Sequence, residues 1–199
     1  MTLIRYIFIL FGSILLLACA QKPTTDASYN YQQQMTALEQ VDSWRINARI
    51  SISTQQETVT ATLNWRKAED FQQLEITGTL GQSYASLEIG PKQSTLLLKD
   101  RAPMVTNNLE ALMMQELGFV LPISLLTNWV RALPADVNEA DIEVDEFGLI
   151  RNMSYKDWRV NYRKYQQYPG MSSLQLPSRM TLSNNSETIK LAIKTWQTL

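Results

Sequence analysis

Hydrophobic and polar residues alternate along most of the chain with a period of two, which is typical of β-strands half buried in a sheet. From Trp44 to Ser53 every second residue is apolar, and the residues between are arginine, asparagine or serine. Similar short runs cover approximately residues 58–65, 74–76, 85–89, 95–99, 142–144, 149–155, 158–162, 180–182 and 189–193. Short strands at roughly ten-residue spacing favour an antiparallel meander.

Three segments instead have apolar residues three or four positions apart, as expected for amphipathic helices. They cover residues 28–40, 107–118 and 122–134. Asn107 or Asn108 is expected to cap the second helix and Gly118 to end it, and Pro134 is expected to stop the third. The pattern therefore predicts a mainly β fold with helices (α+β). A sheet of about ten antiparallel strands curls rather than staying flat, so its apolar face is expected to be concave, with the central helix pair as a lid.

The first 18 residues have the organisation of a secretory signal peptide. Arg5 precedes an apolar run from Tyr6 to Leu17, which is too short to cross a membrane as a helix. The only cysteine of the chain, Cys19, follows Leu-Leu-Ala, and this sequence resembles a bacterial lipobox. The resemblance implies cleavage before Cys19 and modification of this residue by an S-diacylglycerol and an N-acyl group. The alternative is an ordinary signal peptide followed by a chance cysteine.

Residues 19–27 are polar and contain a proline, and we expect them to form a lipidated N-terminus and flexible tether. The residues after Cys19 are alanine and glutamine rather than the aspartate that typically retains Gram-negative lipoproteins in the inner membrane. This difference implies the outer membrane. Residues 28–199 are within the usual length of one domain, and we expect a single domain and a monomer.

Composition argues for binding rather than catalysis. The chain has no histidine, which excludes serine–histidine and cysteine–histidine nucleophiles and histidine metal sites. It has no glycine-rich phosphate-binding loop. The formal net charge is −1, too near neutral for a nucleic-acid-binding protein. We expect no enzyme activity, no metal and no cofactor apart from the lipid on Cys19.

Five carboxylates outside the obvious loops are the remaining candidates for acid–base chemistry. They are Asp70, Glu75, Glu88, Glu110 and Glu116. None stands in a recognisable motif, and most fall on the polar side of an amphipathic pattern. A carboxylate-based hydrolase acting on cell-wall glycans is the enzymatic alternative, and replacement of Glu75 or Glu88 by glutamine tests it.

The sequence resembles the LolB family of outer-membrane lipoprotein receptors over nearly the whole mature chain. The most specific segment is LPISLLTNWVRALPAD, residues 121–136, supported by LNWR around Trp65, DWRVNY around Trp158 and a near-terminal Trp196. The resemblance implies an open antiparallel half-barrel capped by short helices. It also implies a lipid-anchored protein on the periplasmic face of the outer membrane. Such a protein accepts lipoproteins from the periplasmic carrier LolA in an apolar cavity and inserts them into the outer-membrane phospholipid without ATP.

The resemblance also indicates two sets of functional residues. Leu80 and Gly81 match a membrane-contacting loop of the family, with Gly78-Thr79 where the family often has Asn-Pro. The alternative is that Leu80 folds back onto the core. The inward-facing residues expected to line the acyl-chain cavity are Ile46, Ala48, Ile50, Leu63, Trp65, Leu87, Leu112 and Trp129, and the alternative for each is ordinary core packing.

Arg45, Arg49 and Arg66 have two interpretations. They are expected to form a solvated strand face, and the alternative is attraction of an acidic carrier surface or of lipid headgroups. At the level of the whole protein, the alternative to a lipoprotein receptor is a structural or assembly lipoprotein whose apolar face docks on a protein partner.

Overall fold

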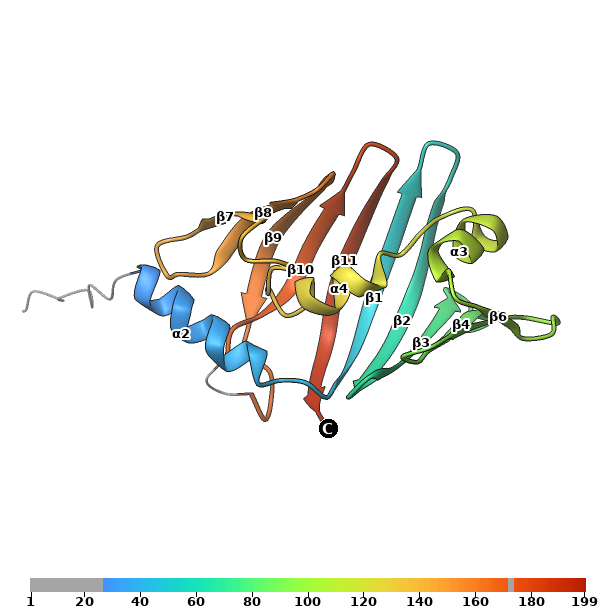
Figure 1. Ribbon diagram of the computed structural model, residues 1–199, viewed down its shortest axis with the longest axis horizontal. Helices are drawn as coiled ribbons and strands as arrows, with labels where there is room; N and C mark the ends of the chain where they lie inside the picture. Colours follow the sequence, from blue (N-terminus) through green and yellow to red (C-terminus); the bar gives the residue numbers. More distant parts are fainter. Residues whose placement is uncertain (1–26, 172–173) are drawn as a thin grey trace, which may run out of the picture.

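Eleven strands pair in one antiparallel sheet within residues 27–171 and 174–199, the part of the chain that the computed structural model describes (Figure 1). The strands are β1 (Trp44–Thr54), β2 (Thr58–Ala68), β3 (Phe71–Gly78), β4 (Ser83–Ile89), β5 (Ser94–Leu98), β6 (Met104–Thr106), β7 (Asp141–Val144), β8 (Ile150–Tyr155), β9 (Trp158–Gln166), β10 (Leu176–Ser183) and β11 (Glu187–Thr198). Their order is β6-β5-β4-β3-β2-β1-β11-β10-β9-β8-β7. Two meanders therefore meet in the middle of the sheet, where β1 pairs with β11.

The register of β1 and β2 separates the two faces of the sheet. Ile46 lies opposite Trp65, and both side chains are buried. Arg45 lies opposite Arg66, and both are exposed. Because successive side chains point to opposite faces of a strand, one face of this hairpin is apolar and the other polar. The strands predicted from alternation are confirmed here.

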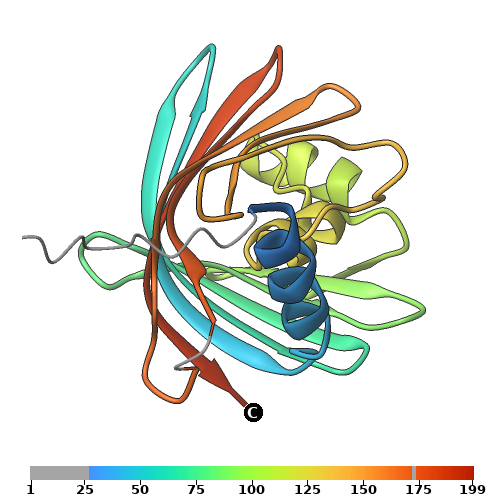
Figure 2. The same ribbon diagram turned by 90° about the vertical axis from the view of Figure 1, so that its left-hand side faces the viewer.

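The sheet curls around three helices, all of which lie on its concave side (Figure 2). They are α2 (Ala27–Glu39), α3 (Leu109–Leu117) and α4 (Ile123–Trp129). β6 and β7 form the two ends of the strand order, so the sheet is open. The predicted α+β fold, an open antiparallel sheet with short helices on its apolar face, is confirmed.

Tryptophans fill the concave side where β1, β2 and β11 adjoin. The ring of Trp44 lies 5.0 Å from that of Trp65 and 5.1 Å from that of Trp196, measured between centroids. All three side chains are at most 2% exposed. Such tilted contacts between large aromatic rings add to the stabilisation that burial alone provides. The cluster fixes the junction of the two meanders.

The ends of α3 follow the sequence signals. Asn108 accepts a hydrogen bond from the backbone N–H of Ala111 through its side chain, and thus caps the helix. Gly118 adopts a left-handed conformation with φ 76°, which glycine allows without strain, and its N–H bonds to the carbonyl oxygen of Met114. Both predicted signals are confirmed.

Two predictions about the middle of the chain are wrong. The three-residue strand β6 was not expected, because so short a run shows no alternation. The helix that begins near Pro122 ends at Trp129 rather than at Pro134. Ala132 takes a left-handed φ of 57° there, and the N–H of Leu133 bonds to the carbonyl of Asn128. This termination motif normally uses glycine, so the sequence carried no signal for it.

No helix in the described ranges is both long enough and apolar enough to span a lipid bilayer.

Candidate functional site

Leu80 lies at the tip of the turn between β3 and β4. The N–H of Gly81 bonds to the carbonyl of Gly78 at 2.9 Å, and the N–H of Gly78 bonds to the carbonyl of Gln82 at 2.9 Å. Gly81 has a φ of 83°, in the left-handed region that closes this kind of three-residue hairpin. The side chain of Leu80 is 91% exposed, so it does not fold back onto the core. Two backbone hydrogen bonds fix the turn although no proline is present.

The residues predicted to line an acyl-chain cavity come together on the concave side of the sheet. Ile46, Ala48, Ile50, Leu63, Trp65, Leu87 and Trp129 are buried, and Leu112 on α3 is half-buried. All belong to, or pack against, one hydrophobic core. In this conformation the helices cover them, and none lines the pocket beside α2 described below. Their contact with an acyl chain therefore stays a prediction.

Helix α4 is attached to both halves of the sheet. The hydroxyl of Thr127 lies 2.7 Å from the carbonyl oxygen of Ile123 and 3.1 Å from the side-chain oxygen of Gln72 on β3, and its one proton is shared between them. The indole N–H of Trp65 donates to the same Gln72 oxygen at 3.2 Å. On the other side, the hydroxyl of Tyr162 on β9 donates to the carbonyl of Trp129 at 2.9 Å. These bonds hold α4 in place across the concave face. Burial raises the pKa of Tyr162 well above its usual value, so this donor stays protonated at neutral pH.

Arg131 connects α4 to the end of α2. Its guanidinium donates to the carbonyl of Val41 at 2.9 Å and, more weakly, to that of Leu38 at 3.5 Å. It also donates to the side chain of Asn128 at 2.9 Å and to the carbonyl of Thr127 at 3.2 Å. The side chain is only 6% exposed. The buried cation thus satisfies backbone carbonyls at the C-terminus of α2, where the helix dipole also favours positive charge.

The surroundings of Arg131 have opposite effects on the pKa of its guanidinium. Burial lowers the pKa of the guanidinium, whereas the carboxylates of Asp42 and Glu39 raise it. Within the described ranges, no carboxylate lies at ion-pair distance from Arg131. Its main partners are therefore neutral oxygens.

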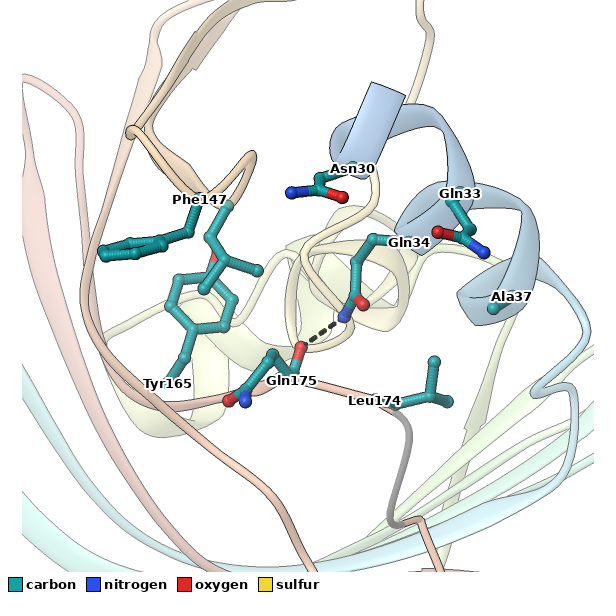
Figure 3. Close-up of a pocket in the computed structure, with 9 residues that line it drawn as sticks. Asn30, Gln33, Gln34, Ala37, Phe147, Tyr165, Leu174 and Gln175 are labelled. Atoms are coloured by element: carbon teal, nitrogen blue, oxygen red, sulfur yellow. Dashed lines mark hydrogen bonds between the residues drawn. The ribbon is translucent and has the colours of Figure 1, made fainter. Parts of the chain in front are cut away.

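A pocket of about 660 Å³ lies between α2 and the turn that joins β7 to β8 (Figure 3). Its lining residues are Asn30, Gln33, Gln34, Ala37, Phe147, Leu149, Tyr165, Leu174 and Gln175. The side chain of Gln34 donates to the carbonyl of Gln175 at 2.7 Å across it. Phe147 lies across the pocket from α2 and is 66% exposed, with its ring pointing away from the α2 residues. The pocket is therefore open to solvent and mixed in polarity.

Beneath α2 the same pocket adjoins a small void of about 10 Å³. Met35, Leu38, Ala132 and Ile150 line this void together with residues shared with the larger pocket. Its walls are mostly apolar, and it has room for about one water molecule, too little for an acyl chain. Met35 and Leu38 of α2 line this void and also belong to the hydrophobic core, so the void lies where the pocket adjoins the core.

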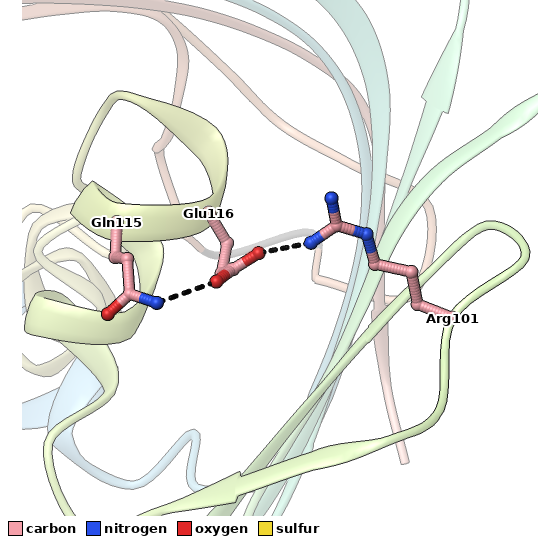
Figure 4. Close-up of polar contacts among 3 residues, drawn as sticks. All are labelled: Arg101, Gln115 and Glu116. Carbon is pink, nitrogen blue, oxygen red and sulfur yellow. Dashed lines mark hydrogen bonds and ion pairs between the residues drawn. The ribbon is translucent and has the colours of Figure 1, made fainter.

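Polar contacts at the surface attach α3 to the sheet. Arg101, on the turn after β5, forms an ion pair with Glu116 of α3, and the side-chain amide of Gln115 donates to the same carboxylate at 2.8 Å (Figure 4). The Arg101 side chain is 59% exposed. Exposed ion pairs stabilise little because solvent screens them. These contacts position α3 without fixing it as firmly as α4.

The five candidate carboxylates do not meet in one place, although Glu75 and Glu88 are diagonal neighbours on the outward face of β3 and β4. Asp70, Glu75, Glu88 and Glu110 are exposed on different elements, and Glu116 is held by Arg101. Among residues 27–171 and 174–199, no three histidine, cysteine, aspartate or glutamate side chains are grouped so as to hold a metal ion. The described residues instead provide a buried apolar face, a pocket of mixed polarity beside α2 and a solvent-exposed leucine.

The sequence did not reveal the residues that attach the helices. Gln72, Arg131 and Tyr162 were not singled out, although Arg131 lies within the segment 121–136 that carries the family resemblance. A single arginine within the mostly apolar residues 121–135 is the available signal, although it follows α4 rather than lying in it. Cys19 and the signal peptide lie outside the described residues.

Comparison with known proteins identifies the family. The family model "Outer membrane lipoprotein LolB" matches residues 42–196. The outer-membrane lipoprotein LolB of Cellvibrio japonicus is 30% identical over 184 residues, covering 92% of this chain and 91% of that protein. LolB of Aeromonas hydrophila is 28% identical over 196 residues, covering 98% of each chain.

Solved structures share the fold at low sequence identity. A LolA superfamily protein from Nitrosomonas europaea superposes with a TM-score of 0.51 at 9% identity, over 85% of this chain and 93% of the other. A DUF1329 family protein from Desulfovibrio piger gives 0.53 at 10% identity, over 87% and 94%. The family match over most of the chain and the open sheet with helices on its concave face agree: the chain belongs to the LolB family of outer-membrane lipoproteins.

Proposed function

We propose that this protein accepts lipoproteins from a LolA-like periplasmic carrier and inserts them into the outer membrane without ATP. Membership of the LolB family supports a role in outer-membrane lipoprotein localisation. The observation that carries the finer proposal is the concave apolar face, which a curled sheet forms and which helices, rather than a second sheet, cover. Helices can move away from such a face without breaking the strand pairing.

Helix α2 is the part of this cover best suited to move. The side-chain bond from Gln34 to the carbonyl of Gln175 attaches its middle, and Arg131 holds its C-terminal end. The apolar void of about 10 Å³ lies directly beneath it. We infer that α2 turns about the Arg131 end, so that the pocket and the void join and acyl chains reach the core residues on the concave face.

Acyl transfer of this kind runs downhill in free energy. Each methylene group moved out of water gains about 0.8 kcal/mol. The acyl chains of a lipoprotein must therefore stay buried in a protein or a bilayer at every step of the transfer. Transfer runs in one direction if the carrier binds the acyl chains more weakly than this protein does, and if this protein binds them more weakly than the bilayer does. ATP hydrolysis is then unnecessary.

Two further features suit delivery to a membrane. Leu80 presents an apolar side chain on a fixed turn, 91% exposed, where it would enter the bilayer surface. A lipid on Cys19 would keep the protein on the periplasmic face of the outer membrane. Replacement of Cys19 by alanine is then expected to leave a protein that no longer fractionates with membranes through a lipid anchor.

Depletion of the protein in cells tests the proposal. Outer-membrane lipoproteins are expected to accumulate on the soluble carrier, because the acceptor is missing. Normal delivery of these lipoproteins after depletion contradicts the proposal.

Binding of the dye bis-ANS distinguishes this function from a protein-docking role. An acyl-chain cavity releases the dye when fatty acid is added, whereas a protein interface does not.

A further inference from the structure

The outward face of four adjacent strands is strongly basic. β1, β11, β10 and β9 lie side by side in this order, and together they carry eight lysines or arginines and one acidic residue. The basic residues are Arg45, Arg49, Arg159, Arg163, Lys164, Arg179, Lys190 and Lys194, all of them exposed. The acidic one, Glu187, is buried. The whole chain has 18 basic and 19 acidic residues, so these strands concentrate positive charge.

Four of these cations surround one shallow depression of about 320 Å³. Arg49, Arg163, Arg179 and Lys190 line it, and no acidic residue does. None of the four forms an ion pair or side-chain hydrogen bond with the described part of the chain. We call this group the convex basic depression, because it lies on the face opposite the helices.

The strand register explains the shape of the convex basic depression. Arg49 on β1 and Arg179 on β10 both lie opposite Ala192 of β11, which separates them. The small methyl group leaves space between the two guanidinium groups. In the next row, Lys190 lies between the hydroxyl residues Ser51 and Thr181. Donors from three strands therefore converge on one position.

This combination suits a phosphate group. A guanidinium presents a planar fork of donors that matches phosphate oxygens, and hydroxyl groups supply further hydrogen bonds. Like charges on neighbouring strands repel each other unless an anion offsets them. The observations thus indicate a site for an anionic group rather than a merely solvated surface.

The residues of this face are better suited to bind lipid headgroups than to bind a protein. Specific protein interfaces depend on apolar and aromatic residues at their centre. The large apolar residues that are exposed in the described chain lie outside β1, β9, β10 and β11: Phe71, Leu80, Leu97, Val105, Met114, Val137, Phe147 and Leu199. A face of cations and hydroxyl groups without apolar anchors fits a surface of many phosphates.

We propose that the convex face of β1, β11, β10 and β9 binds an anionic phospholipid surface, with headgroup phosphates in the convex basic depression. Binding in this orientation directs the concave side, with α2, away from the bilayer and toward an incoming carrier. The inference rests on the proposed function only in placing the protein at a membrane. It concerns a different face from the one that takes acyl chains.

Vesicle flotation tests this proposal, with the full chain carrying Cys19→Ala so that no lipid anchor dominates. Vesicles of phosphatidylcholine alone are compared with vesicles that also contain phosphatidylglycerol, at low and high salt. Any contribution of residues 1–18 to vesicle binding is the same in every variant. The protein is expected to prefer the anionic vesicles, and high salt is expected to remove the preference.

The combined substitution Arg49→Gln, Arg163→Gln, Arg179→Gln and Lys190→Gln is expected to reduce that preference at least about tenfold. The matched control neutralises four exposed cations outside these four strands: Arg66→Gln, Lys92→Gln, Lys99→Gln and Lys156→Gln. The control is expected to keep most of the preference.

Equal binding of both vesicle types by the protein with the unsubstituted face at low salt overturns the proposal, even if the fourfold variant does not fold. Unchanged vesicle preference in a folded fourfold variant overturns it as well. If that variant also fails to accept cargo from the carrier, the face is a site for an acidic protein instead. Acceptance of cargo in solution is measured separately, so failure of the proposed function is distinguishable from failure of this inference.

Discussion

The guanidinium of Arg131 donates a 2.9 Å hydrogen bond to the carbonyl oxygen of Val41, and so connects α4 to the chain that leaves α2. This buried bond joins the segment after α4, the helix attached to the sheet, to the end of α2, which lines the pocket. In the proposed mechanism, it is the fixed end about which the rest of α2 turns.

Replacement of Arg131 by methionine is expected to lower the free energy of unfolding by about 1–3 kcal/mol, because buried carbonyls lose their donor. Amide hydrogen exchange in α2 should become faster while exchange in β1 changes less. Chemical denaturation and exchange detected by mass spectrometry measure the two effects. As a control, Arg66→Met on the exposed face should stay within about 0.5 kcal/mol of the parent. Equal effects of the two substitutions would remove Arg131 from this role.

Linking α2 to the segment below it should block uptake of cargo. Cysteines at Gln34 and Gln175, joined by a short reducible bis-thiosulfonate reagent, hold α2 against this segment, because the Gln34 side chain already donates to the backbone carbonyl of Gln175. Uptake from the carrier is expected to fall on cross-linking and to return on reduction. Cysteines at Ser53 and Thr58, which contact each other in the β1–β2 hairpin, serve as the control pair. Normal uptake with α2 cross-linked shows that acyl chains enter elsewhere.

Leu80→Glu should permit acceptance of cargo but impair insertion into liposomes. The substitution places a charge at a position that is 91% exposed and does not contribute to the core, so the fold is expected to remain intact. Acceptance and insertion are measured as separate steps with a labelled lipoprotein. Val137→Glu, at a residue 61% exposed outside this turn, is the matched control. Insertion at the parental rate by Leu80→Glu excludes this leucine from delivery.

The stability of the protein should depend on the protonation of Glu187. Burial raises the pKa of this carboxyl, and a hydrogen bond from the N–H of Val120 only partly opposes the effect. A raised pKa in the folded state means that the contribution of Glu187 to stability is full below its unfolded pKa and is lost as pH rises through the folded value.

Glu187→Gln keeps an oxygen for the Val120 N–H and removes the buried charge. It should therefore raise the unfolding free energy relative to the parent at neutral pH, and the difference should disappear in acid. Denaturant titrations at both pH values measure it, with the exposed Glu88→Gln as the control. If Glu187→Gln stabilises the protein equally in acid, the buried charge of Glu187 is not the cause.

The fold was largely predictable because alternation is a local property. Strand β1 shows it in every residue from Trp44 to Ser53, and the caps of α3 are equally local signals. The end of α4 was not predictable, since Ala132 takes a conformation that normally requires glycine. The role of Arg131 depends on a carbonyl 90 residues away in sequence.

The convex basic depression also could not be predicted from the pattern of the sequence. Arg49 was visible as one member of a polar strand face, but only the pairing of β1 with β11 brings it near Arg179. Likewise, alternation identified Ile46 and Leu63 as inward-facing without showing that helices cover them. Periodicity gives the face of a residue, whereas strand order gives its neighbours.

The most direct test of the central claim is photo-cross-linking of a cargo lipoprotein whose acyl chains carry a photoreactive group. The protein is loaded from the carrier in the absence of ATP, irradiated and mapped by mass spectrometry. We predict labels on inward-facing residues of the concave side, such as Leu63 and Trp129, and few on their outward neighbours such as Thr62. Labels confined to the convex face, or no transfer from the carrier without ATP, would contradict the account.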